Sequence, residues 1–183
     1  MTNLDCLRCD LCIVRRNVVA GEGNLHSKLM FIGEAPGYKE DRTGRPFVGK
    51  AGTLLTTYME AHGFDRRRNS YLTNTIKCRP PMNRIPTDVE TLNCMPYLLK
   101  EILTINPTII VSLGATALQT LFGNKGISLT RSRGYLYPLH NAVVYPMYHP
   151  SYILQSCNYF YYDQDFKTLS QLYKLLINPN HYG

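Results

Sequence analysis

The chain has 183 residues, and 44% of them are hydrophobic, which is enough to form one sizeable core. It contains no linker-like or low-complexity tract and no apolar run near the roughly 20 residues of a membrane helix. The net charge of +7 modestly favours a polyanionic partner such as nucleic acid. The N-terminal segment MTNLDCLRCD is acidic and rich in thiols, unlike a signal peptide. We therefore expect one domain over residues 1–183 in a soluble, cytoplasmic, monomeric protein that does not enter a membrane.

Short apolar or β-branched runs alternate with segments of helical periodicity along the chain. The expected strands are residues 28–33, 70–78, 108–114 and 142–150. The expected helices are residues 51–63, 87–105, 115–123 and 165–178. In the second of these helices, Thr87 and Glu90 can form a capping box, and Pro96 is expected to kink or interrupt the helix. The alternation predicts an α/β fold, a three-layer α/β/α sandwich with a central, mainly parallel four-stranded sheet.

The segment FIGEAPGYKEDRTGRPFVG, residues 31–49, follows the first expected strand. It combines acidic residues, glycines and one aromatic residue near its end. Parallel sheets bind ligands in the loops at the carboxyl ends of their strands, and this segment is such a loop. The sequence therefore predicts a binding site for a small ligand here.

The cysteines indicate a second kind of site. Cys6 and Cys9 form a C-x2-C pair, whereas Cys78 and Cys94 lie far downstream. Cys12 would form another C-x2-C pair with Cys9, so the spacing alone does not fix which pair is used. Thiols in a cytoplasmic chain favour metal binding over disulfides. This wide spacing leaves zinc, an iron–sulfur cluster and unligated thiols open.

Several long motifs, taken together and in order, resemble the family 4 uracil-DNA glycosylases. These motifs are GEAPGYKEDRTGRPFVGKAG (33–52), TNTIKCRPPMNRIP (73–86), IIVSLGATA (109–117) and MYHPSYIL (147–154). The resemblance extends from about Cys6 to Leu154. It implies a [4Fe–4S] cluster with a structural role, because removal of a base needs no electron transfer. The implied cluster ligands are Cys6, Cys9, Cys78 and Cys94.

The resemblance also implies roles for the residues of the pocket. Removal of a base requires an aromatic surface, recognition of the base edge, and stabilisation of the uracil anion and the sugar cation. Phe47 is the implied stacking residue, and Asn74 offers uracil one donor and one acceptor. His149 is expected to hydrogen-bond a uracil carbonyl as negative charge develops on the ring. Glu34 is the second catalytic residue, either as a general base towards water or as electrostatic support for the cation.

The remaining substrate-binding positions are Ala35, Gly37 and Glu40. Ala35 stands where the best-known uracil glycosylases carry an aspartate that activates water, so we expect catalysis to depend more on stabilising the leaving group and the cation. Glu40 is expected to close the pocket against the methyl group of thymine. Asp41 is interpreted as a cap of the following turn, outside the site.

Basic and aromatic residues beside these motifs are candidates for contacts with DNA, the expected partner, which is uracil-containing and single- or double-stranded. We expect Arg79 and Arg84, with Lys77 beside them, to contact phosphates. Further candidates are Arg133 and Ser151 for phosphate, and Tyr152 or Ile153 as a wedge into the gap left by a flipped base. The arginines at 66–68 are interpreted as a solvated basic face.

The sequence thus predicts a monofunctional glycosylase that excises uracil from DNA in base excision repair and leaves an abasic site. One alternative is a glycosylase of the same superfamily retargeted to another modified or deaminated base. Another is a cluster-bearing module that binds DNA without catalysis. The presence of Glu34, Phe47, Asn74 and His149 together favours the enzyme.

Overall fold

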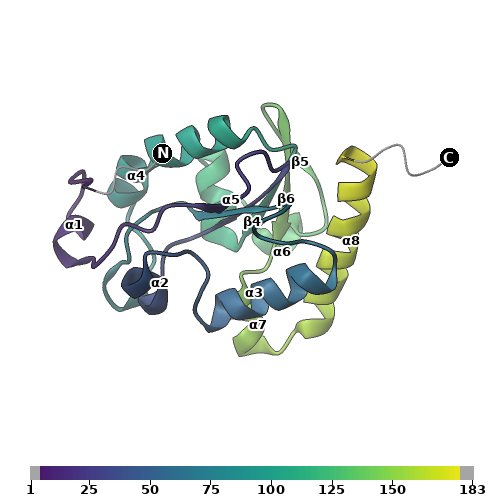
Figure 1. Ribbon diagram of the computed structural model, residues 1–183, viewed down its shortest axis with the longest axis horizontal. Helices are drawn as coiled ribbons and strands as arrows, with labels where there is room; N and C mark the ends of the chain where they lie inside the picture. Colours follow the sequence, from purple (N-terminus) through teal and green to yellow (C-terminus); the bar gives the residue numbers. More distant parts are fainter. Residues whose placement is uncertain (1–4, 178–183) are drawn as a thin grey trace.

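The computed structural model describes residues 5–177, so residues 1–4 and 178–183 of the expected domain lie outside the described residues. Its centre is a six-stranded sheet with the strand order β1-β3-β2-β4-β6-β5 (Figure 1). The strands are β1 (Glu22–Gly23), β2 (Leu29–Gly33), β3 (Tyr71–Asn74), β4 (Ile109–Leu113), β5 (Tyr137–Leu139) and β6 (Ala142–Met147). The helices are α1 (Leu11–Val14), α2 (Tyr38–Thr43), α3 (Lys50–Ala61), η1 (Pro81–Asn83), α4 (Asp88–Ile105), α5 (Ala115–Phe122), α6 (Leu129–Ser132), α7 (Pro150–Ser156) and α8 (Tyr159–Ile177).

The four inner strands are the four that the sequence predicts, and β3, β2, β4 and β6 pair in parallel. Every residue of β2 and β4 is buried, as expected for parallel strands covered on both faces. The predicted total of four strands is wrong, because β1 and β5 add antiparallel edges to β3 and β6. These edge strands have two and three residues, too few for an apolar pattern to stand out in the sequence.

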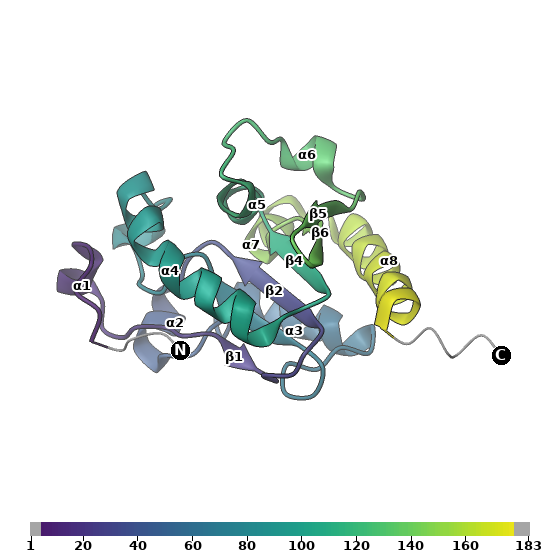
Figure 2. The same cartoon turned by 90° about the horizontal axis from the view of Figure 1, so that it is seen from above.

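Helices cover both faces of the sheet, which confirms the three-layer architecture. On one face, Leu55 of α3, Ile153 of α7 and Phe166 of α8 pack against the strands. On the other face, Leu98 of α4 and Leu118 of α5 pack against them. Figure 1 shows α4 above the sheet and α3 and α7 below it, and Figure 2 shows α4 from above, in front of the strands.

The predicted capping box at the start of α4 is confirmed. The Thr87 hydroxyl accepts the Glu90 N–H at 3.2 Å, and the Glu90 carboxylate accepts the Thr87 N–H at 2.8 Å. Pro96 does not interrupt the helix, which runs continuously over 18 residues, so the predicted interruption is wrong, while a kink at Pro96 stays a prediction. Pro96 lies on the exposed side of α4, where water can reach the Leu92 carbonyl that has lost its donor.

The carboxyl ends of β2, β3, β4 and β6 lie at one edge of the sheet, because these strands are parallel. Predicted site residues lie at or after the ends of β2, β3 and β6, and the motif that continues into the N-terminus of α5 follows β4. Among residues 5–177, none of the helices combines the length and apolarity that a bilayer span requires.

Candidate active site

A cleft of about 940 Å³ opens at the carboxyl edge of the sheet. Segments that follow β2, β3, β4 and β6 contribute its walls, as expected for a parallel α/β sheet. All the predicted catalytic and substrate-binding residues line this one cleft: Glu34, Ala35, Gly37, Glu40, Phe47, Asn74 and His149. The structure thus brings together side chains that are up to 115 positions apart, from 34 to 149, in the sequence.

Asn74 supplies a polar atom that is ready for a ligand. It is the last residue of β3 and is only 2% exposed. Its Oδ1 is buried and has no hydrogen-bond partner among residues 5–177. An unpaired buried polar atom is unfavourable by about 1–3 kcal/mol, so such atoms are commonly explained by a ligand or a water. Gly33 permits this arrangement, since a Cβ there would stand 2.6 Å from Asn74 Oδ1 and 2.7 Å from the Phe47 ring.

Phe47 lines the cleft on a loop that Glu40 holds in place. Glu40 is 7% exposed, and its Oε1 accepts the N–H groups of Val48 at 2.9 Å and Gly49 at 2.6 Å. The absence of a side chain at Gly37 leaves room for this carboxylate, because a Cβ there would lie 2.8 Å from Glu40 Oε2. Glu40 therefore organises the loop, and its exclusion of the thymine methyl stays a prediction.

His149 caps α7, and its contacts determine where its proton lies. The Ser151 backbone N–H donates to His149 Nδ1 at 3.2 Å, and the Ser151 hydroxyl lies 2.7 Å from the same atom. A nitrogen that accepts a backbone N–H carries no proton, so the neutral ring carries its proton on Nε2. Burial lowers the pKa of His149 to about 4, against a smaller opposing effect of the Glu40 charge. The ring is thus a neutral hydrogen-bond donor in the cleft.

Glu34 directly follows β2, and its carboxylate is oriented by α5. Thr116 Oγ donates to Glu34 Oε2 at 2.5 Å. The Glu34 carbonyl accepts the Thr75 hydroxyl at 2.6 Å, which ties this residue to the segment after β3. Sequence reasoning missed Thr116, although its place in the motif after β4, at the same edge of the sheet, is a signal that could have found it.

The residues of the segment HPSYIL differ in exposure, and one of the two predicted wedge residues is buried. Tyr152 is 44% exposed, lines the cleft and packs its ring 4.9 Å from that of Tyr148. Ile153 is fully buried in the core below the sheet, so it cannot act as a wedge, and that alternative is wrong. Ser151 contacts His149, and its contact with phosphate stays a prediction.

The predicted DNA-binding arginines all have partners in the protein. The Arg84 guanidinium donates to both Glu90 carboxylate oxygens, at 2.8 and 2.6 Å, and lines the cleft. Arg133 Nε donates to Asp165 at 2.9 Å. Arg79 donates to the Asn83 side chain at 2.7 Å. Contacts of these arginines with phosphate stay predictions.

Two further expectations are corrected by burial. Lys77 is 1% exposed, and its Nζ donates to Glu101 Oε2 at 2.7 Å and to the Asn74 carbonyl at 2.6 Å, so it does not present a charge to DNA. Asp41 is 4% exposed and accepts the Arg16 N–H at 2.9 Å. It anchors the segment before β1 and does not cap the turn that follows it.

Four of the six cysteines line a second, smaller pocket, and they are Cys6, Cys9, Cys78 and Cys94. Leu11, Val18 and Ile76 contribute apolar side chains to its walls, and the remaining lining residues are Arg8, Arg15, Lys77, Glu90, Asn93 and Tyr97. Cys12 and Cys157 do not line it, and Cys157 is exposed. The structure thus separates the four thiols that the family resemblance implies from the other two.

The thiols of this pocket have surroundings that bear on whether they could bind a metal. Burial raises the pKa of the Cys78 and Cys94 thiols to about 11, so thiolates here require a bound cation to stabilise their charge. Arg15 Nη1 lies 3.7 Å from Cys78 Sγ and favours negative charge on that sulfur. Within residues 5–177, no three His, Cys, Asp or Glu side chains stand at the spacing of ligands for a single ion.

Comparisons with known proteins agree with this geometry. The sequence profile of the Uracil DNA glycosylase superfamily matches residues 20–170. The chain is 49% identical to the type-4 uracil-DNA glycosylase of Thermotoga maritima over 152 residues, which are 82% of this chain and 79% of that protein. It is 40% identical to the type-4 uracil-DNA glycosylase of Sulfurisphaera tokodaii over 188 residues, 98% of this chain and 84% of that protein.

A third relative, the type-4 uracil-DNA glycosylase of Archaeoglobus fulgidus, is 39% identical over 177 residues, which cover 92% of this chain and 88% of that protein. The matches span both the cleft and most of the sheet that supports it. The chain belongs to the uracil DNA glycosylase superfamily, and within it to the type-4 uracil-DNA glycosylases.

Proposed function

We propose that this chain, as a single domain, excises uracil from DNA by hydrolysing the N-glycosidic bond and leaves an abasic site in an intact strand. The observation that carries the proposal is the unpaired Asn74 Oδ1, which is buried at the wall of the cleft beside the Phe47 ring. Uracil presents an N–H that this oxygen can accept and a carbonyl that the Asn74 amide N–H can reach. Cytosine presents the opposite pattern.

The base has to leave the duplex stack to reach this cleft, and stacking against Phe47 compensates part of the lost stacking energy. As the glycosidic bond breaks, negative charge develops on the uracil ring. The Nε2 proton of neutral His149 is available to a uracil carbonyl, and this hydrogen bond strengthens as the charge grows. Glu34, held by Thr116, supplies a carboxylate for the sugar cation or for the attacking water.

We further propose that Cys6, Cys9, Cys78 and Cys94 hold a [4Fe–4S] cluster. Four thiols in one pocket and an arginine beside one of them support this assignment. The cluster would stabilise the fold by joining the N-terminal segment to the loop after β3 and to α4, which are distant in sequence. The protein would act inside the cell as a monomer on its DNA substrate.

Replacing Cys78 with serine is expected to remove most of the brown colour of the purified protein, because a cluster without one of its four thiolate ligands is held more weakly and is lost during purification. The measurement is visible absorbance with iron and acid-labile sulfide content after anaerobic purification. Cys12→Ser is the matched control, since Cys12 does not line the pocket, and it should retain the cluster. A colourless wild-type protein that contains zinc would contradict the assignment.

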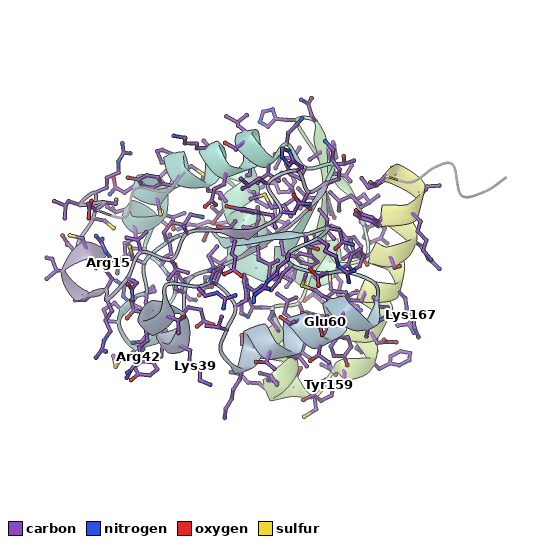
Figure 3. All side chains as sticks on the ribbon, in the orientation of Figure 1. Arg15, Lys39, Arg42, Glu60, Tyr159 and Lys167 are labelled. Carbon is purple, nitrogen blue, oxygen red and sulfur yellow. The ribbon has the colours of Figure 1, made fainter. Side chains whose placement is uncertain are left out.

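Basic residues are positioned to contribute to DNA binding. Figure 3 shows Arg15, Lys39 and Arg42 around α1 and α2, and Lys39 also lines the cleft. Arg79 lies between two cleft-lining residues, donating to Asn83 and placing its guanidinium 5.2 Å from the Tyr38 ring centre. We propose that Lys39, Arg42 and Arg79 contact the phosphates that flank the flipped nucleotide.

Arg79→Ala is therefore expected to weaken binding to undamaged duplex and to lower the slope of log K against log salt by about 0.9, the value of one phosphate contact. The measurement is a binding titration over a series of salt concentrations. Arg68→Ala removes an 85% exposed arginine side chain and serves as the control with an unchanged slope. Equal slopes for Arg79→Ala and the wild type would place the DNA-binding face elsewhere.

The proposed function is tested with oligonucleotides that contain a single uracil, hypoxanthine or thymine. Strand breaks should appear with uracil, and only after alkali treatment, because a monofunctional enzyme leaves the backbone intact. Excision of hypoxanthine in preference to uracil would instead favour a retargeted glycosylase. Specific binding of uracil-containing DNA without any excision would favour a non-catalytic module.

A further inference from the structure

The loop that carries Phe47 is held from outside by two oppositely charged side chains. Glu40 accepts the N–H groups that follow Phe47, as described above. Arg66 Nη2 donates to the Pro46 carbonyl at 2.6 Å and Nη1 donates to the Phe47 carbonyl at 3.3 Å. Consecutive backbone groups on residues 46–49 are thus fixed by one carboxylate and one guanidinium.

Arg66 departs from the solvated basic face that the sequence suggests. Its side chain is 15% exposed, whereas that of Arg68 is 85% exposed, and Arg67 is also exposed. Arg66 Nε is buried without a hydrogen-bond partner among residues 5–177 and lies 3.7 Å from Glu22 Oε1. Burial of a guanidinium is unfavourable unless its N–H groups find acceptors, and here the acceptors include the two carbonyls of the loop.

The backbone at Phe47 depends on such outside contacts. Its φ is +54°, in the left-handed region that residues with side chains rarely adopt. This conformation persists only where the surroundings hold it. Gly52 packs directly against this backbone, since a Cβ there would lie 2.1 Å from the Phe47 carbonyl carbon. The place of the ring in the cleft therefore follows from how the loop is held.

We propose that Arg66 is a positioning residue, which holds the Pro46 and Phe47 carbonyls so that the Phe47 ring stands where it can stack on a base. This inference rests on the proposed function, because the stacking partner is the flipped uracil. Loss of the two hydrogen bonds would let the loop relax. A displacement of about 1 Å at a reacting site costs about 10²-fold in rate.

The first test is single-turnover uracil release at saturating enzyme. Arg66→Ala should lower the rate about 10- to 100-fold, with unchanged affinity for undamaged duplex, which does not enter the cleft. Arg66→Lys should give an intermediate rate, because an ammonium can hold one carbonyl but lacks the planar fork that reaches both. Arg67→Ala, the exposed neighbour, should react at the wild-type rate. Each rate is divided by the fraction of that variant that is folded, which is measured from its unfolding curve.

The second test reports on the loop without catalysis. The chain contains no tryptophan, so Phe47→Trp introduces a single tryptophan at the loop, whose emission can be excited selectively over that of the 14 tyrosines. Adding Arg66→Ala should lower the fluorescence anisotropy of this variant, whereas adding Arg67→Ala should leave it unchanged. This readout remains valid if the wild type releases no uracil, which would overturn the proposed function alone.

Wild-type rates in Arg66→Ala, or the same anisotropy with and without it, would overturn the role of Arg66. Equal slowing by Arg67→Ala would also overturn it, since the effect would then be one of general surface charge. If Arg66→Ala does not fold, Arg66→Lys provides the test instead. A wild-type rate together with wild-type anisotropy in Arg66→Lys would then overturn the role of Arg66.

Discussion

Replacing His149 with alanine is expected to lower the single-turnover rate of uracil release by about 10²–10³, the usual effect of removing one donor to a developing anion. Binding of uracil-containing DNA should change little, because the hydrogen bond strengthens mainly in the transition state. Rapid-quench kinetics and an equilibrium titration measure the two quantities. His26→Ala, which removes an exposed histidine, is the control. Wild-type rates in His149→Ala would remove this residue from the site.

The pH dependence tests the same donor. Burial lowers the pKa of His149 to about 4, from an ordinary value near 6.5, so the neutral ring with its Nε2 proton is present throughout the range from pH 5 to 8. The rate should therefore show no ionisation of this residue near pH 6.5. Nitrogen NMR of the labelled imidazole should report the neutral form at pH 6. An imidazolium signal at pH 6 would contradict the assignment.

The leaving group separates His149 from Glu34. With 5-fluorouracil, whose anion leaves more readily, His149→Ala should lose less activity than with uracil. The defect of Glu34→Gln should be similar for both bases, because the sugar cation is the same. Equal sensitivity of the two variants to the leaving group would refute this division of roles.

Lys77→Met is expected to lower the free energy of unfolding by about 3–5 kcal/mol, the cost of leaving one partner of a buried ion pair uncompensated. Lys77 is 1% exposed and Glu101 is 5% exposed, and their charged atoms lie 2.7 Å apart. The substitution also removes the donor to the Asn74 carbonyl. Denaturant unfolding measures the change. The control is Lys100→Met, an exposed lysine, which should shift stability by less than about 0.5 kcal/mol.

The double variant Lys77→Met with Glu101→Leu should recover part of this loss, because neither charge of the pair is then left buried without its partner. Its recovery will be incomplete, since the Thr73 hydroxyl at 2.7 Å and the Gly21 N–H at 3.1 Å also lose their carboxylate acceptor. An unchanged unfolding midpoint in Lys77→Met would show that the pair contributes nothing to stability.

The parts of the fold that the sequence predicts are those with a long local pattern. The apolar runs of β2 and β4 and the Thr87 capping box each lie within a few consecutive residues, and the structure confirms them. The edge strands β1 and β5 form by pairing with β3 and β6, so no local sequence pattern predicts them. The continuity of α4 through Pro96 likewise depends on which side of the helix faces water.

The cleft residues were predicted by their motifs, but their partners were not. Thr116 contacts Glu34 from α5, and only its place in the motif after β4 could have pointed to it. Arg66 contacts the Phe47 loop from a segment with no motif, so the sequence carries no signal of that contact. Lys77 lies in a basic segment that suggests DNA binding, yet its side chain turns inwards to Glu101. Burial of a charge follows from tertiary structure, and charge alone cannot reveal it.

The most direct test of the cleft as a uracil site is mass-spectrometric detection of the free base released from a uracil-containing oligonucleotide, with wild type and Asn74→Ala side by side. The wild type should release one free uracil for each uracil residue and leave an intact strand with an abasic site. Asn74→Ala, which removes the unpaired Oδ1, should release uracil far more slowly at equal folded fraction. Release of no base by the wild type, or equal rates for the two proteins, would contradict the assignment of this cleft.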